Sequence, residues 1–130
     1  MIVLDASAVL EILLYTPVGV ALQGRIIARG ESLHAPHLLD VEVAQVLRRY
    51  VRVQAITEQR ARGALADLAD LRLRRYPHSP LLPRAWELRD NLTAYDAIYV
   101  ALAEAVAAPL VTRDRRLASS AGHRAEVQVV

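Results

Sequence analysis

The stretch IVLDASAVL, residues 2–10, decides the fold of this 130-residue chain. Its first three residues form a continuous apolar run, which is typical of a strand covered on both faces within a parallel sheet. The run ends at Asp5, and a helical pattern of apolar residues begins after Ser7. We therefore expect a buried strand that leads directly into a helix, with an aspartate where the strand ends.

The rest of the chain repeats this alternation between short apolar runs and longer stretches of helical period. Such alternation predicts an α/β fold, built from βαβ units on a mainly parallel sheet. No linker rich in proline, glycine or serine divides the chain, so we expect a single domain over residues 1–130. The expected strands are residues 2–4, 32–35, 71–76, 110–112 and 127–130, and the expected helices begin near Ser7, Pro17, Pro36, Thr57, Pro83, Thr93 and Arg115.

The composition excludes several classes of enzyme. All 16 basic side chains are arginine, so Schiff-base chemistry and a P-loop lysine are excluded. The chain has no cysteine, which excludes a thiolate nucleophile and a zinc-cysteine site. The formal net charge is only +2, which does not indicate a polycation that coats nucleic acid. No uncharged apolar segment is long enough to span a membrane, so we expect a cytoplasmic protein without a membrane helix.

Four acidic residues occupy positions that need an explanation. Asp5 and Asp114 each follow an expected strand, at the sheet edge where open α/β folds bind their ligands. Asp96 lies in the first turn of the helix that Thr93 opens, and Glu42 lies on the apolar stripe of the helix from Pro36. Helix capping is the alternative for the three aspartates, and an ion pair or a place at the edge of the stripe is the alternative for Glu42.

As a set, these acids favour one kind of chemistry. Carboxylates that converge repel one another unless a proton or a cation is present. Mg²⁺ and Mn²⁺ prefer carboxylate and water oxygens, and they can activate a water against a phosphodiester. The sequence therefore favours metal-assisted phosphodiester hydrolysis.

Four motifs carry a resemblance to a known family. In chain order they are VLDASA (3–8), VEVAQVLRR (41–49), YDAIYVALAEA (95–105) and LVTRDRRLA (110–118). Together they resemble the PIN domain, and they closely resemble the VapC toxins of bacterial toxin–antitoxin pairs. This resemblance implies a three-layer α/β/α domain that cleaves RNA with Mg²⁺ or Mn²⁺. It also implies a small antitoxin that inserts a segment into the catalytic groove, and a homodimer.

The resemblance also implies roles for individual residues. The catalytic roles fall on the four acids Asp5, Glu42, Asp96 and Asp114, with direct metal ligation expected first of Asp5 and Asp96. Direct ligation by Asp114 is the weakest of these assignments.

Residues beside the acids receive supporting roles. Ser7 and Thr112 match the small hydroxyl residues that accompany the first and last acids, where they orient carboxylates or water. Arg113, Arg115 and Arg116 surround the last acid, where some family members carry further acids. These arginines either contact RNA phosphate or form a solvated helix face.

Other polar and aromatic residues are assigned elsewhere. His34 and His37 have an H-x-x-H spacing, but the proline between them breaks the helix that would align them, so we expect surface or loop histidines. Tyr95 and Tyr99 either stack on bases or pack, and Trp86 is expected in the core. A non-catalytic PIN-fold module that binds nucleic acid or protein, and a metal-dependent DNA nuclease, remain the alternative functions.

Overall fold

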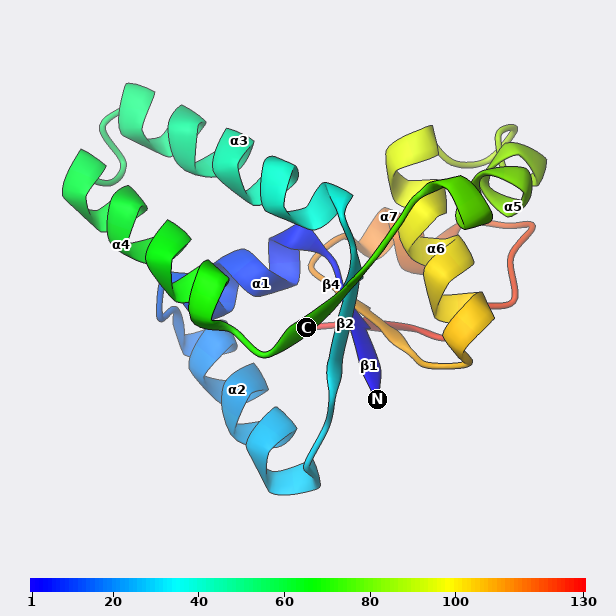
Figure 1. The fold of residues 1–130 in the computed structure, drawn as a ribbon, viewed down its shortest axis with the longest axis horizontal. Coiled ribbons are helices and arrows are strands. Elements are labelled where there is room, and N and C mark those ends of the chain that lie inside the picture. The colour runs from blue at the N-terminus through cyan, green and yellow to red at the C-terminus, as the bar shows by residue number, and fades with distance from the viewer.

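The computed structural model describes residues 1–130 and contains one five-stranded sheet (Figure 1). The strand order is β3-β2-β1-β4-β5, and all four pairings are parallel. The prediction of a mainly parallel sheet is therefore confirmed. The strands are β1 (Ile2–Leu4), β2 (Leu33–Pro36), β3 (Leu73–Tyr76), β4 (Leu110–Thr112) and β5 (Val127–Val129).

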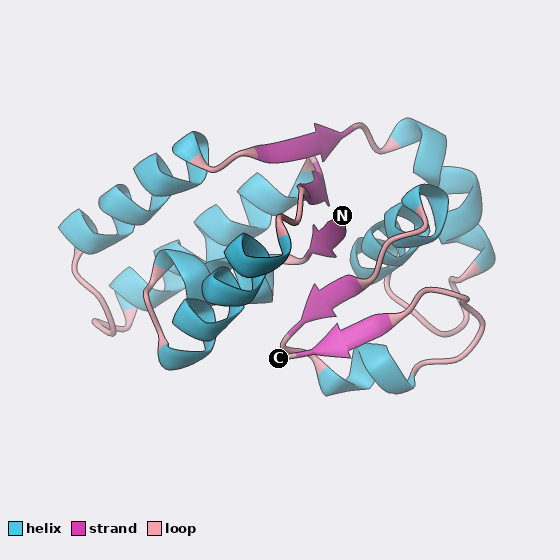
Figure 2. Cartoon of the chain, turned by 90° about the horizontal axis from the view of Figure 1, so that it is seen from below, coloured by secondary structure: helices cyan, strands magenta, loops and turns pink.

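Helices cover both faces of this sheet, which gives three layers (Figure 2). Helix α6 packs against β1, β2 and β4 and is covered by α5, whereas α1 packs with α2, α3 and α4 on the other face. The expected α/β/α architecture is confirmed. The helices are α1 (Ala6–Leu13), α2 (Pro17–Arg29), α3 (Leu38–Arg52), α4 (Glu58–Asp70), the 3₁₀ turn η1 (Ser79–Leu81), α5 (Leu82–Glu87), α6 (Ala94–Val106) and α7 (Arg115–Ser119).

Short polar side chains begin most of the helices. Thr16, Thr57 and Thr93 precede α2, α4 and α6, and each hydroxyl accepts a hydrogen bond from a backbone N–H of the first turn. Asp5 and Asp114 cap α1 and α7 in the same way. The capping alternative therefore holds for these two aspartates, and any chemical role is additional to it.

The strand order determines which chain segments meet. β1 lies at the centre between β2 and β4, and Leu4 pairs with Val111. The residues that follow β1 and β4 consequently leave the same edge of the sheet side by side. β1 is buried along its length, within a core cluster of 34 hydrophobic residues. No single helix is long and apolar enough to cross a membrane; α1 and α2 reach the length and composition only as a pair, and they are bent by 99° at their junction.

Several boundaries differ from the sequence prediction: β2 spans Leu33–Pro36, β3 begins at Leu73 and β5 ends at Val129. Pro36 is the last residue of β2, paired with Tyr76 of β3, so α3 begins at Leu38 rather than at the proline. The helix expected near Pro83 is α5, which has only six residues and ends at Glu87. A proline is compatible with the start of a helix and equally with the end of a strand, because neither position requires its missing N–H.

Two side chains lie where the sequence did not predict them. Trp86 is 69% exposed, because α5 packs against the core through Ala85 and is followed by the buried Leu88. His34 is buried in β2 rather than on a surface. Its Nδ1 lies 2.7 Å from the Tyr76 hydroxyl and its Nε2 lies 2.9 Å from Ser32 Oγ, so hydroxyl partners satisfy both ring nitrogens.

Candidate active site

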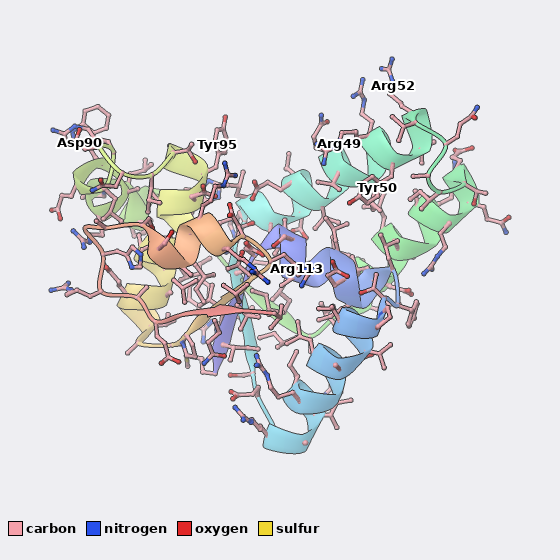
Figure 3. The ribbon with its side chains drawn as sticks, turned by 180° about the vertical axis from the view of Figure 1, so that it is seen from behind. Arg49, Tyr50, Arg52, Asp90, Tyr95 and Arg113 are labelled. Carbon is pink, nitrogen blue, oxygen red and sulfur yellow. The ribbon has the colours of Figure 1, made fainter.

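A groove of about 850 Å³ opens at the carboxyl edge of β1 and β4, and all four predicted acids line it. Helices α1 and α3 contribute apolar side chains to one side, and the beginning of α6 lies on the other. In Figure 3, Arg49 of α3 and Tyr95 of α6 stand on opposite sides of this opening, with Arg113 between them. The groove therefore gathers side chains that lie more than a hundred residues apart in the sequence.

Asp5 is the most enclosed of the four acids. Its Oδ1 accepts hydrogen bonds from Ser7 Oγ at 2.6 Å and from the Ala8 N–H at 3.0 Å, and its Oδ2 accepts one from the Thr112 hydroxyl. Burial raises the pKa of Asp5 above its usual range, and the hydrogen bonds from Ser7, Thr112 and Ala8 oppose that rise. The two predicted hydroxyl residues therefore both contact the first acid.

Glu42 is partly buried at the edge of the α3 stripe. Its Oε1 accepts a hydrogen bond of 2.6 Å from the Tyr99 hydroxyl, which α6 carries from the other side of the groove. Burial raises the pKa of Glu42, and the charges of Asp5 and Asp96 add to this effect, while the Tyr99 hydrogen bond opposes it. No arginine pairs with Glu42, so its inward position is not explained by an ion pair.

Asp96 lies in the first turn of α6, where the Thr93 hydroxyl accepts its backbone N–H at 3.2 Å. Burial raises the pKa of the Asp96 carboxyl, and the charge of Asp114 raises it further. Like Asp5 and Glu42, it forms no ion pair. The charge of Arg116 opposes this rise only weakly, and the N-terminus of α6 adds the positive end of the helix dipole.

Asp114 differs from the other three acids. Partial burial acts to raise its pKa, but hydrogen bonds from the backbone and side chain of Arg116 outweigh it and hold the pKa below the usual range. The ion pair with Arg116 has an N–O distance of 3.4 Å. Asp114 is therefore already partly neutralised.

The three arginines around Asp114 are not equivalent. Arg113 lines the groove and pairs with Glu11 of α1, with 3.2 Å between Nε and Oε1. Arg115 and Arg116 lie outside the groove lining and are exposed at the start of α7. For these two residues the structure agrees with a solvated helix face.

The donor set fits a hard divalent ion. The groove offers carboxylate oxygens without an ion-pair partner, and burial raises the pKa values of Asp5, Glu42 and Asp96. The charges of neighbouring acids raise the pKa values of Glu42 and Asp96 further. No three acidic or histidine side chains converge closely enough to hold one ion among them. Mg²⁺ is commonly held by one or two carboxylates, with water and substrate phosphate completing its shell, so this arrangement suits Mg²⁺ better than an ion that needs a full protein cage.

Two contacts of the site were not identified from the sequence. The Tyr99 hydroxyl contacts Glu42, although its spacing from Asp96 indicated only that the two lie on neighbouring turns of one helix face. Glu11 pairs with Arg113, and its place four residues after Ser7 is the signal that would have put it on the same face of α1.

Comparison with known proteins agrees with this fold. The family profile of the PIN domain matches residues 2–122. The chain is 45% identical over 130 residues to Ribonuclease VapC12 of Mycobacterium tuberculosis, covering 100% of this chain and 99% of that protein. It is 47% identical over 137 residues to Ribonuclease VapC1 of the same species, covering 98% and 96%. A toxin–antitoxin complex from Klebsiella pneumoniae shares the fold with a TM-score of 0.63 at 22% identity, covering 92% of this chain and 91% of that one.

The chain belongs to the PIN-domain family, among its VapC-type members. The resemblance predicted from the four motifs is thereby confirmed.

Proposed function

We propose that this protein is a Mg²⁺-dependent endoribonuclease toxin of a type II toxin–antitoxin system, formed by a single PIN-like domain over residues 1–130. The observation that carries the proposal is the set of three carboxylates, on Asp5, Glu42 and Asp96, that line one groove without an ion pair in a chain with 16 arginines. Its full-length relatives are named ribonucleases, which supports RNA as the substrate.

Asp5 and Asp96 are the proposed ligands of Mg²⁺ or Mn²⁺, since both line the groove, Asp5 at the end of β1 and Asp96 in the first turn of α6. A bound ion of this kind would lower the pKa of a water and neutralise charge on the phosphate. Ser7 and Thr112 hold the Asp5 carboxylate in one orientation, and the Tyr99 hydroxyl does the same for Glu42. Glu42 lines the same groove, so we assign it the proton of the attacking water, and its raised pKa makes its carboxylate a stronger base than an ordinary glutamate.

Asp114 supports the site mainly through its charge and its cap on α7, because Arg116 already neutralises part of that charge. Arg113 is the arginine that we assign to RNA phosphate, since it lines the groove. Arg115 and Arg116 are assigned at most a long-range attraction for RNA, which salt would screen.

The direct test is cleavage of RNA by the purified protein with Mg²⁺ or Mn²⁺, before and after chelation. We expect cleavage that EDTA abolishes and that added metal restores. Substitution of Asp96 by asparagine keeps the size of the side chain and removes the charge, so this variant should not cleave. Metal-independent cleavage, or a fully active Asp96→Asn, would refute the mechanism. A single-stranded DNA of the same sequence, tested in parallel, decides between a ribonuclease and a DNA nuclease.

We further propose a small antitoxin protein as partner, a homodimer as the toxin unit, and the cytoplasm as the place of action. The shared fold with a chain of a toxin–antitoxin complex supports the partner. Co-expression with the protein encoded immediately upstream should suppress toxicity and give a complex on size exclusion. A protein that is toxic in the presence of that partner would contradict the pairing.

A further inference from the structure

Arg113 is tied to the candidate site through its backbone and by its place in the groove. Its backbone N–H donates to Ser7 Oγ at 2.9 Å, and the same hydroxyl donates to Asp5. The residue lines the groove, and Figure 3 shows it in the middle of the molecule, beside α1. Ser7 Oγ thus links the backbone of Arg113 to the carboxylate of Asp5.

The guanidinium of Arg113 is held at two of its three nitrogens. Its Nε lies 3.2 Å from Glu11 Oε1, and its Nη1 donates to the backbone carbonyl of Val130. Nη2 makes no hydrogen bond within the chain, and the side chain is 41% exposed. A guanidinium in this state still has free N–H groups in a fixed plane, which is the arrangement that binds a phosphate.

Glu11 is itself firmly anchored. The Thr16 hydroxyl donates to its carboxylate, and the Thr16 N–H donates to its backbone carbonyl at 3.2 Å. A Cβ on Gly19 would lie 1.9 Å from that carbonyl oxygen, so α2 approaches α1 here as closely as a glycine permits. With its backbone fixed and its side chain only 23% exposed, Glu11 presents its carboxylate to Arg113 in a defined place.

We propose that Glu11 is a positioning residue, which orients the guanidinium of Arg113 so that its free Nη2 binds a phosphate of the RNA in the groove. The inference rests on the proposed function, because the phosphate belongs to the proposed substrate. Glu11 does not touch the substrate. It removes the conformational freedom that a long arginine side chain would otherwise lose on binding.

The alternative is that the Glu11–Arg113 pair only joins α1 to the end of β4. A double-mutant cycle distinguishes the two roles. If Glu11 acts through Arg113, its removal has no effect on cleavage once Arg113 is gone. If the pair is only structural, both single variants lower the melting temperature, and their activity follows the folded fraction.

The experiment measures single-turnover cleavage of a single-stranded RNA at saturating Mg²⁺ by the parent, Glu11→Gln, Arg113→Ala and the double variant. Glu58→Gln is the matched control, since Glu58 forms an exposed ion pair with Arg62 and does not line the groove. We expect Arg113→Ala to slow cleavage by about a hundredfold and Glu11→Gln by about tenfold. We expect the double variant to equal Arg113→Ala, and the control to equal the parent.

A Glu11→Gln effect that persists in the Arg113→Ala background, or a Glu11→Gln that cleaves like the parent, overturns the inference. The same four proteins are also compared for RNA affinity by fluorescence anisotropy in an Asp96→Asn background. If the parent does not cleave RNA but affinity shows the same non-additivity, the proposed function fails and the positioning role stands. If the parent cleaves and neither measurement shows coupling, the positioning role fails and the function stands.

Discussion

Glu104 and Asp5 are both buried carboxylates, with 8% of the Glu104 side chain and 9% of the Asp5 residue exposed, but the structure gives them different partners. Glu104 on α6 accepts two hydrogen bonds from the Arg84 guanidinium, at 2.8 and 3.1 Å, and one from the Arg124 N–H. Arg84 lowers the pKa of Glu104. Asp5 accepts hydrogen bonds from neutral groups only, and burial raises its pKa.

The difference shows where the chain stabilises itself and where it does not. At Glu104 an arginine forms an ion pair with the enclosed carboxylate, so that charge has a cationic partner. At the groove, Asp5, Glu42 and Asp96 remain without a cation, although Arg113 and Arg116 lie nearby and pair with other acids. Unpaired acids gathered in one groove are a cost to folding that a bound cation would offset.

The largest expected effect is on catalysis. Asp5→Asn and Asp96→Asn should each slow RNA cleavage by more than about a hundredfold, because loss of even an outer-shell partner of a metal ligand typically costs about ten- to a hundredfold. Glu104→Gln should cleave at the rate of the parent when it is folded. Single-turnover cleavage at 25 °C measures all three variants. A Glu104→Gln variant as inactive as Asp96→Asn would contradict the distinction between Glu104 and the acids of the groove.

The next effect is on stability, and substitutions at the two acids should change the free energy of unfolding in opposite directions. Glu104→Gln should lower the free energy of unfolding by about 2 kcal/mol at neutral pH, since it removes a charged partner of a buried arginine contact. Asp96→Asn should raise the free energy of unfolding of the metal-free protein, because a carboxyl with a raised pKa is ionised at a cost in the folded state. Urea denaturation in EDTA measures both, and an Asp96→Asn that unfolds at lower urea than the parent would contradict the second expectation.

The pH dependence of the Glu104 contribution follows from its lowered pKa. The folded state binds its proton less tightly than the unfolded state, so the contribution is fully present above the ordinary carboxyl value of 4.5. It is lost as the pH falls through the lower folded pKa. Denaturation curves of the parent and Glu104→Gln should therefore differ at pH 7 and converge below pH 4.5. A gap of constant size down to the most acidic pH would show that packing, rather than charge, explains it.

A smaller effect is expected from metal. At ten times its dissociation constant, Mg²⁺ should stabilise the parent by about 1.4 kcal/mol, which is roughly 5 °C in melting temperature for a domain of this size. Asp96→Asn should show little of this shift, and Glu104→Gln should show all of it. Differential scanning calorimetry with and without Mg²⁺ provides the measurement, and an equal shift in Asp96→Asn would place the ion elsewhere.

The smallest effect concerns Tyr99. Tyr99→Phe removes the hydrogen bond to Glu42 and should cost about 1 kcal/mol of stability. Cleavage should slow by only a few-fold, because Glu42 keeps its place on α3 and loses one restraint. Tyr95→Phe, on the exposed turn before, is the matched control. A Tyr99→Phe variant with full activity would remove the positioning of Glu42 from the mechanism.

The sequence alone predicted the parallel sheet and the carboxyl edge of β1, because a continuous apolar run that ends at Asp5 is difficult to interpret as anything but a buried strand in a short α/β chain. The interpretation of Trp86 as core was wrong, since aromatic character does not reveal that a six-residue helix packs through its small residues. His34 was misplaced because burial of a histidine depends on hydroxyls from Ser32 and Tyr76, of which Tyr76 is distant in sequence.

Contacts between segments set the rest of the site. The sequence identified the acids and hydroxyls by position, but the pairing of Glu11 with Arg113 depends on the crossing of α1 with the turn after β4. The same holds for Tyr99 and Glu42, which α6 and α3 bring together. Such pairs have no fixed spacing along the chain, so only the fold reveals them. The chemical roles of the site residues, and the single domain over residues 1–130, stay predictions.

The hydroxyl groups of Ser7 and Thr112 each receive a backbone N–H, from Arg113 and Asp114 respectively, and each gives its only hydrogen to Asp5. The direction of both bonds is thus dictated by peptide groups rather than by side chains. Any residue other than proline at positions 113 and 114 supplies the same N–H groups, so Asp5 stays an acceptor whichever side chains these two positions carry.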